Sequence, residues 1–294
     1  MERISPKSVL ALRMFLRRVL CDGGAQSPNP DADMIICGVL RVSRTWLLSR
    51  PREEPPGEKR DLALSLARRR ANGEPLAYLL GDAFFCGRKF FVDKSTLIPR
   101  PETEILTGIA DGFLKKIGGG SFADWCTGSG CIAVTLCADN PGFTAFAVDS
   151  SPAALASARR NAEFHGVADR ITFIECDDPA AAPIKPESLD MAIANPPYIP
   201  SAVIGTLESQ VRDYEPREAL DGGADGLYVF RSLLGGLPCF LKPGAALFFE
   251  TGGGKQPGEI AEIAAREAPS LSLEKILRDH REITRFMLWR KLPK

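Results

Sequence analysis

Histidine is scarce in this sequence, which contains only His165 and His280 among its 294 residues. A histidine-based metal site or a Ser-His-Asp triad therefore lacks the side chains that it needs. The eight cysteines include no Cys-x-x-Cys pair, and several, such as Cys131 and Cys137, lie in apolar segments. Because buried reduced thiols are typical of such segments, we expect neither a disulfide framework nor a bound metal ion.

Long apolar runs are also missing. Nowhere do about 18 apolar residues follow one another, so we expect no membrane span. Glu2 and Arg3 stand near the start of the sequence, which argues against a signal peptide. With 45% hydrophobic and 25% charged side chains, the composition is that of a globular protein with one large domain and a smaller one. A cytoplasmic, monomeric protein is the expectation.

The formal net charge is zero, but charge is unevenly distributed along the chain. Residues 1–100 hold 18 Lys and Arg against 11 Asp and Glu, whereas the remainder holds 19 against 26. A basic front part suggests an acidic or RNA-associated partner, and an ordinary solvated surface is the alternative.

The front of the chain has a helical pattern. Apolar residues recur at helical spacing over residues 1–82, which predicts a small helical domain, with Asp31 capping a helix that starts near Met34. Aromatic residues then flank Gly87 in a hairpin pattern, and a proline-bracketed segment follows. We interpret residues 83–104 as a hairpin and connector.

Short apolar runs alternate with helix-like stretches over residues 105–294. The runs cover residues 122–126, 144–149, 171–176, 189–195 and 245–251. Such alternation predicts an α/β domain with a mostly parallel sheet, helices on both faces and a ligand site at the carboxyl ends of the strands. Two closing runs, residues 271–278 and 283–289, have no convincing helix between them and predict a terminal antiparallel pair.

The first strand ends in a glycine-rich segment, Asp124-Trp125-Cys126-Thr127-Gly128-Ser129-Gly130. It predicts a tight turn that lets a ligand approach the backbone, although such a turn also serves dinucleotides or merely turns a corner. Asp149 ends the next strand, where its carboxylate can accept hydrogen bonds from two ribose hydroxyls or instead cap the helix near Pro152. Asp177, after the third strand, could read an adenine amino group, cap a helix or lie exposed. Together the turn and Asp149 indicate a nucleoside ligand.

The fourth strand closes with Asn195-Pro196-Pro197-Tyr198, beside the predicted nucleoside pocket. The Asn195 side-chain oxygen and the Pro196 carbonyl can accept the two hydrogens of an amide or amino nitrogen. Fixed acceptors of this kind would aim a conjugated nitrogen at a methyl donor and stabilise the positive charge that builds on it. Tyr198 would pack against the flat group and exclude water. A Pro-Pro turn without chemistry is the alternative.

Four motifs in order give the sequence a family resemblance. Ile98-Pro99-Arg100-Pro101-Glu102-Thr103-Glu104, the glycine turn, Asn195 to Tyr198, and Glu215-Pro216-Arg217-Glu218-Ala219-Leu220 resemble those of release-factor glutamine methyltransferases, the HemK or PrmC type. The resemblance covers nearly the whole chain. It implies a Rossmann-like class I methyltransferase sheet behind a helical substrate-docking domain. It also implies transfer of a methyl group from S-adenosylmethionine, which becomes S-adenosylhomocysteine, to N5 of the glutamine in the Gly-Gly-Gln loop of peptide chain release factors.

The resemblance also implies site residues. The expected catalytic residues are Asn195, Pro196 and Tyr198. The expected cofactor contacts are Cys126, Thr127, Gly128, Ser129, Gly130, Asp149, Asp177, Asp178 and Asn195. The expected substrate contacts are Asn195, Pro196, Pro197 and Tyr198. Apart from the resemblance, the connector residues Arg100 and Glu102 could also contact the substrate, or instead clamp the two domains through an ion pair.

Two residues depart from the family pattern. The family usually has glycine where Cys126 stands, so the turn must accommodate a Cβ atom, which can alter cofactor affinity. The position of Asp178 is often aromatic in the family, so adenine stacking is weaker or comes from another residue.

Three other functions remain open at this point. A methyltransferase acting on a glutamine of a ribosomal large-subunit protein shares the turn and the Asn-Pro-Pro-Tyr motif, but its connector differs from Arg100-Pro101-Glu102-Thr103-Glu104. An adenine-N6 DNA methyltransferase reaches the same kind of nitrogen by base flipping. However, the acidic catalytic part and the absence of a large insertion argue against stable DNA binding. A binding module that has lost catalysis is the third alternative, which only Cys126 encourages.

Overall fold

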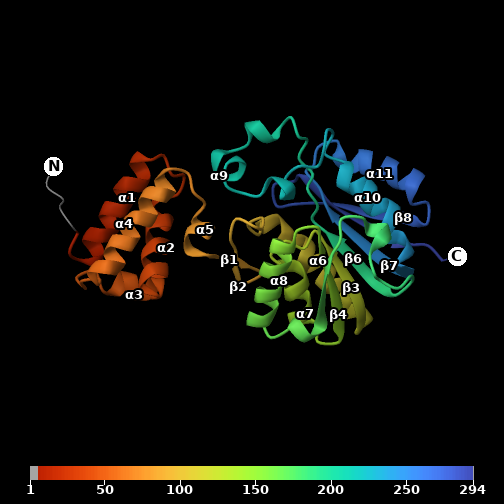
Figure 1. Cartoon of the computed structure of the whole chain (residues 1–294), viewed down its shortest axis with the longest axis horizontal. Coiled ribbons are helices and arrows are strands. Elements are labelled where there is room, and N and C mark those ends of the chain that lie inside the picture. Colours follow the sequence, from red (N-terminus) through yellow and green to blue (C-terminus); the bar gives the residue numbers. More distant parts are fainter. Residues whose placement is uncertain (1–5, 294) are drawn as a thin grey trace. The chain divides into compact units, whose positions relative to one another are not determined.

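The computed structural model describes residues 6–293, which form two compact units. The first unit holds the described residues up to Asp82 together with Glu208–Tyr214, and the second holds Ala83–Leu207 and the chain from Glu215 onward. Figure 1 shows the elements of each unit. None of the helices formed by residues 6–293 has the length and apolar character needed to cross a bilayer.

The first unit is helical, as the spacing of apolar residues predicts. Its helices are α1 (Val9–Asp22), α2 (Pro28–Leu40), α3 (Arg44–Ser49), α4 (Gly57–Ala71), α5 (Leu76–Leu80) and α9 (Ser209–Arg212). Leu12, Leu16 and Leu20 recur every four residues on one face of α1 and are fully buried in a core shared with α2 and α4. This unit therefore has an apolar core of its own.

Asp31 does not cap a helix, so that expectation is wrong. Helix α2 begins at Pro28, whose fixed φ suits the first helical position, and Ser27 stands before it. Asp31 lies one turn inside the helix and is 6% exposed. Its carboxylate accepts a hydrogen bond from Nε of Arg70 at 2.7 Å, which joins α2 to α4.

Seven residues from the later part of the sequence belong to the helical unit. Nη1 of Arg70 donates to the side-chain oxygen of Gln210 at 3.2 Å, and the Tyr214 hydroxyl donates to the Asn72 carbonyl at 3.3 Å. The segment Glu208–Tyr214 thus belongs to the helical unit, although the residues before and after it in the sequence belong to the second unit. The expected domain boundaries assign this segment to residues 105–294.

The second unit is an α/β domain. Its strands are β1 (Asp82–Phe85), β2 (Arg88–Phe91), β3 (Gly120–Trp125), β4 (Phe143–Asp149), β5 (Ile171–Glu175), β6 (Leu189–Ala194), β7 (Leu241–Glu250), β8 (Leu271–Arg278) and β9 (Thr284–Lys291). Its helices are α6 (Pro101–Ile117), α7 (Cys131–Asp139), α8 (Pro152–Phe164), α10 (Tyr228–Gly236) and α11 (Gln256–Glu267). The short 3-10 turns are η1 (Ala168–Arg170), η2 (Pro179–Ala181), η3 (Ile204–Thr206), η4 (Arg217–Ala219) and η5 (Leu237–Cys239).

Seven strands form the main sheet in the order β5-β4-β3-β6-β7-β9-β8. The pairs from β5 to β7 are parallel, and β9 is antiparallel to both β7 and β8. The predicted mostly parallel sheet and its terminal antiparallel pair are therefore confirmed. Strand β7 begins four residues before the predicted run because Leu241 already pairs with Leu189 across an irregularity in register.

Two apolar layers enclose this sheet. One face packs against α6 and α7, where Leu106 and Leu136 are fully buried, and the other packs against α10 and α11, where Phe230 and Ile260 are fully buried (Figure 1). Because the chain order changes direction between β3 and β6, a crevice is expected at the carboxyl ends of these two strands.

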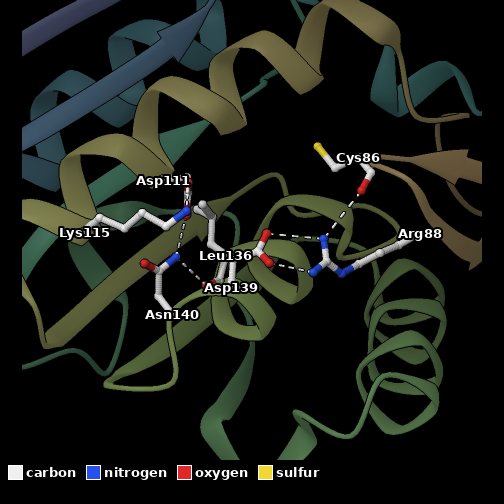
Figure 2. Close-up of polar contacts among 7 residues, drawn as sticks. All are labelled: Cys86, Arg88, Asp111, Lys115, Leu136, Asp139 and Asn140. Carbon is white, nitrogen blue, oxygen red and sulfur yellow. Dashed lines mark hydrogen bonds and ion pairs between the residues drawn. The ribbon is translucent and has the colours of Figure 1, made fainter.

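The β1–β2 hairpin is fastened to the large domain by polar contacts (Figure 2). The Arg88 guanidinium donates to both carboxylate oxygens of Asp139, at 2.6 and 3.2 Å, at the end of α7. Next to it, Asp111 of α6 accepts hydrogen bonds from Asn140 at 2.9 Å and from Lys115 at 2.6 Å. These contacts hold the hairpin, α6 and α7 together. They therefore restrain the two elements that the segment between the hairpin and α6 connects.

Candidate active site

A cavity of about 630 Å³ lies where β3, β4, β5 and β6 end. The expected site residues that line it are Arg100, Cys126, Thr127, Gly128, Ser129, Asp149, Asp177, Asn195 and Pro197. Glu102, Gly130, Asp178, Pro196 and Tyr198 are not among its lining residues. In the part of the chain that the structure describes, no three His, Cys, Asp or Glu side chains gather as a metal site would require.

The glycine turn is built around a buried carboxyl group. Asp124 is fully buried, and its Oδ2 accepts hydrogen bonds from the Thr127 hydroxyl at 2.6 Å and from the Ala133 amide at 3.1 Å. Burial raises the pKa of the Asp124 carboxyl to about 7. The side chain therefore ties the end of β3 to the start of α7 across the turn.

Glycine is needed at Gly130 for two reasons. Its φ of 77° is left-handed, and a Cβ atom there would lie 2.9 Å from the Cβ atom of Ala158 in α8. Gly128 is also left-handed, with φ of 54°. The turn consequently brings backbone close to the cavity.

Cys126 also has a left-handed backbone, with φ of 58°. A residue with a Cβ atom is strained in this region, which is why glycine suits the position and cysteine does not. Burial, together with the nearby Asp149 and Asp124 carboxylates, raises the pKa of the Cys126 thiol well above its ordinary value. The raised pKa favours the protonated thiol. Cys126 is only partly buried at the cavity, and its unusual feature is its left-handed backbone.

Asp149 braces two loops at the cavity. Its Oδ2 accepts from the Gly128 amide at 2.9 Å and its Oδ1 from the Ser151 amide at 3.0 Å. Helix α8 is capped by Ser151, whose hydroxyl accepts from the Ala154 amide, so Asp149 is not the helix cap. Burial raises the pKa of Asp149. Its carboxylate is held at the cavity wall, where the sequence predicts the ribose contact.

The two acidic residues after β5 differ in their surroundings. Both are exposed, but only Asp177 lines the cavity. Oδ1 of Asp178 accepts from the Ala180 amide at 3.0 Å as the cap of η2. Asp178 thus shapes the turn beside the cavity, and its expected contact with the cofactor stays a prediction.

Asn195 lies at the cavity with a defined amide orientation. Its Nδ2 donates to Oγ1 of Thr103 at 2.9 Å, and that hydroxyl donates to Oε2 of Glu250 at 2.8 Å. Thr103 and Glu250 are 3% and 1% exposed. Neither was expected as a site residue, although Thr103 stands inside the connector motif and Glu250 ends a predicted strand.

The backbone at Tyr198 is held by Gln256, which lies outside the motifs of the sequence. The Nε2 atom of Gln256 donates to the carbonyls of Tyr198 at 2.9 Å and Gly226 at 3.0 Å, while its Oε1 accepts from the Gly252 amide at 2.7 Å. The Tyr198 ring packs against the apolar core, and burial raises the pKa of its hydroxyl to about 12. Gln256 thus joins the loop after β6 to the segments at Gly226 and Gly252. No local pattern in the sequence signals this role.

Arg100 forms an ion pair inside the second unit. Its Nη2 lies 2.6 Å from Oε1 of Glu215, which is 6% exposed and whose Oε2 also accepts from the Ile98 amide at 3.2 Å. The pair joins the connector to the start of the Glu215–Leu220 motif. Arg100 also lines the cavity, so a contact with substrate stays a prediction, as does that of Glu102.

Comparison with known proteins gives two family matches. The PrmC N-terminal domain model matches residues 11–81, and the methyltransferase small domain model matches residues 110–207. The release factor glutamine methyltransferase of Nitratidesulfovibrio vulgaris is 39% identical over 90% of this chain and 89% of the relative. That of Moorella thermoacetica is 37% identical over 92% of this chain and 93% of the relative. The chain belongs to the release factor glutamine methyltransferase family.

Solved structures resemble this family member in fold alone. The hMettl16 catalytic domain, in complex with the MAT2A 3'UTR hairpin 6, aligns with a TM-score of 0.55 at 14% identity, over 84% of this chain and 88% of that one. The ribosomal protein L11 methylase of Lactobacillus delbrueckii subsp. bulgaricus aligns with a TM-score of 0.50 at 17% identity, over 69% and 84%. The expected methyltransferase fold is thereby confirmed.

Proposed function

We propose that this chain transfers a methyl group from S-adenosylmethionine to N5 of the glutamine in the Gly-Gly-Gln loop of peptide chain release factors, and so tunes translation termination. The near-full-length similarity to release factor glutamine methyltransferases is the observation that carries this proposal. The position of Asn195 at the cavity supports it.

The cavity residues fit the cofactor. The turn Cys126–Gly130 offers backbone to an elongated ligand, and the Asp149 carboxylate has lone pairs left for hydroxyl donors. The indole nitrogen of Trp125, which also lines the cavity, is buried without a hydrogen-bond partner among the described residues. When bound, S-adenosylmethionine supplies a methyl group on a sulfonium centre and leaves as S-adenosylhomocysteine.

Asn195 and Pro196 carry the chemical step in this proposal. Because Nδ2 of Asn195 donates to Thr103, Oδ1 is the atom of its amide that accepts one hydrogen of the substrate amide. The Pro196 carbonyl accepts the other. The nitrogen lone pair is delocalised and nucleophilically weak, so holding it in line is the main contribution of the protein. The fixed oxygens stabilise positive charge on the methylated nitrogen, whose surplus proton then passes to solvent.

The remaining assignments of the proposal concern partners. The release factor is the protein partner, a monomer acts on it, and stable DNA binding is not expected. Because a release factor is a translation factor, we expect the chain to act in the cytoplasm. The similarity to release factor glutamine methyltransferases favours a release-factor substrate over the ribosomal-protein and DNA alternatives.

The test is methyl transfer from labelled S-adenosylmethionine to a purified release factor. A factor with glutamine replaced by alanine in its Gly-Gly-Gln loop serves as one control and duplex DNA as the other. Label on the intact factor alone supports the proposal. Label on the alanine variant or on DNA contradicts it.

A further inference from the structure

A chain of three side chains runs inward from the cavity wall. Asn195 follows β6, Thr103 lies in the first turn of α6, and Glu250 is the last residue of β7. Nδ2 of Asn195 lies 2.9 Å from the Thr103 hydroxyl, which lies 2.8 Å from the Glu250 carboxylate. The inner two residues are almost completely buried, so water does not compete for these hydrogen bonds.

The protons available on these three side chains determine which atom donates in each hydrogen bond. A hydroxyl has one proton, and an ionised Glu250 can only accept, so Thr103 donates that proton to Glu250. Toward Asn195, Thr103 is then only an acceptor and requires the NH2 group. Turning the Asn195 amide over would set two oxygen acceptors against each other and leave a buried hydrogen bond unmade.

We propose that Thr103 and Glu250 are positioning residues that lock the Asn195 amide with Oδ1 toward the substrate nitrogen. This inference rests on the proposed function, because an oxygen is the required atom only if the substrate presents N–H groups. Thr103 also lines the cavity, whereas Glu250 does not, and in this proposal both act through Asn195.

Protonation of Glu250 would allow the Asn195 side-chain amide to turn over. A protonated Glu250 can donate to Thr103, whose own proton then becomes available to the Asn195 oxygen. The amide can now turn its NH2 group toward the substrate, where donor faces donor and methyl transfer is disfavoured. Activity should therefore rise as Glu250 loses its proton.

The charges around Glu250 set where this happens. Burial raises the pKa of Glu250 to about 7, against the Thr103 hydrogen bond and the nearby Arg285 of β9, which favour the ionised form. At the start of α6, Glu102 raises this pKa further while Arg100 lowers it. The Tyr198 hydroxyl also faces this group, but its own pKa of about 12 keeps it neutral. The change in activity is thus expected near neutral pH.

A matched pair of substitutions at Thr103 tests the positioning role. Thr103→Val keeps the shape and removes the hydroxyl, whereas Thr103→Ser keeps the hydroxyl. With saturating substrates at pH 8, kcat of Thr103→Val should fall about tenfold or more, while the affinity for S-adenosylmethionine stays near the wild-type value. Thr103→Ser should recover most of the loss. Equal kcat for wild type and Thr103→Val, or an equal loss in both variants, would overturn the inference.

The pH profile of kcat tests whether protonation of Glu250 changes the orientation of the Asn195 amide. In the wild type, kcat should rise with pH through a single step near pH 7, and in Glu250→Gln, which has no proton to lose, this step should be absent. Asp124→Asn is the matched control because burial also raises the pKa of Asp124 to about 7. Loss of the step in Asp124→Asn and its survival in Glu250→Gln would contradict the proposal.

The last test does not depend on any substrate, so it separates this inference from the proposed function. The side-chain amide signal of Asn195, assigned by its loss in Asn195→Asp, is followed by NMR between pH 5.5 and about 8.5 to bracket Glu250. We expect a titration near pH 7 that Glu250→Gln abolishes. A signal that does not titrate, or that titrates unchanged in the variant, would overturn the positioning role even if the enzyme methylates release factors. A titrating Asn195 with no methyl transfer would instead contradict the proposed function.

Discussion

The two halves of the cavity are built by different means. On the side that we assign to the cofactor, the turn Cys126–Gly130 presents backbone, and Asp149 is held by two backbone amides. On the side of Asn195, side chains position side chains, through Thr103 and Glu250. A backbone site depends on local conformation and leaves a contiguous motif in the sequence. A side-chain site depends on residues that the fold brings together.

The largest expected effect comes from the side-chain half. Asn195→Ala removes the oxygen that we propose accepts a hydrogen of the substrate amide, so kcat should fall by about 10²–10³-fold, as for loss of one fixed transition-state partner. The measurement is methyl transfer at saturating cofactor, with circular dichroism as a check that the fold is kept. Normal turnover in this variant would eliminate the mechanism.

A smaller effect is expected on the cofactor half. Asp149→Ala removes the predicted acceptor for two ribose hydroxyls, and hydrogen bonds to a charged group contribute about 1.5–3 kcal/mol, so cofactor affinity should fall by about 10–100-fold. Calorimetric titration with S-adenosylmethionine measures this. If kcat falls at saturating cofactor while affinity is unchanged, the division of the cavity into two halves is wrong.

The buried carboxyl groups of the two halves give a pH dependence of stability. The pKa values of Asp124 and Glu250 are raised in the folded protein, each to about 7, so the folded state binds more protons than the unfolded state between about pH 4 and 7. Their contribution to stability is therefore fully present at low pH and is lost as pH rises through 7.

Asp124→Asn sharpens this comparison, since asparagine can still accept from Thr127 and Ala133 but does not ionise. The difference in the free energy of unfolding, variant minus wild type, should be larger at pH 8 than at pH 5 by about 1–2 kcal/mol. Denaturant melts at both pH values measure this. A larger advantage at pH 5 than at pH 8 would refute the sign.

The smallest effect concerns the turn backbone. At the left-handed Cys126, a Cβ atom costs about 1–2 kcal/mol, while glycine loses about 0.5–1 kcal/mol more through the flexibility of the unfolded chain. Cys126→Gly should therefore be more stable than Cys126→Ala by about 0.5–1 kcal/mol. Thermal melts compare the two variants. An alanine variant as stable as the glycine variant would show that the turn carries no strain.

The same contrast explains how much the sequence could predict. Alternating apolar runs predicted the sheet, its carboxyl-end cavity and the antiparallel β8–β9 pair, all of which are confirmed. Nine of the fourteen predicted site residues line the cavity, and their roles stay predictions. The strain at Cys126 was also foreseeable, because the family places glycine there.

What the sequence did not reveal depends on distant contacts. Thr103 is 92 residues from Asn195 and 147 from Glu250, and no local period links positions so far apart. Gln256 opens α11 as an ordinary helical residue, and only the fold brings its amide to the Tyr198 carbonyl. Asp31 was misread because an acidic residue in the first turn of a helix resembles a cap when the true start, Pro28, is overlooked.

The most direct test is to locate the methyl group. A release factor is incubated with the enzyme and S-adenosylmethionine, and fragmentation mass spectrometry identifies the modified residue and atom. A single methyl group on the side-chain nitrogen of the Gly-Gly-Gln glutamine, absent when Asn195→Ala replaces the wild type, is the predicted result. A methyl group elsewhere on the factor, or on the same glutamine with Asn195→Ala at the wild-type rate, would contradict the assignment of substrate or of mechanism, respectively.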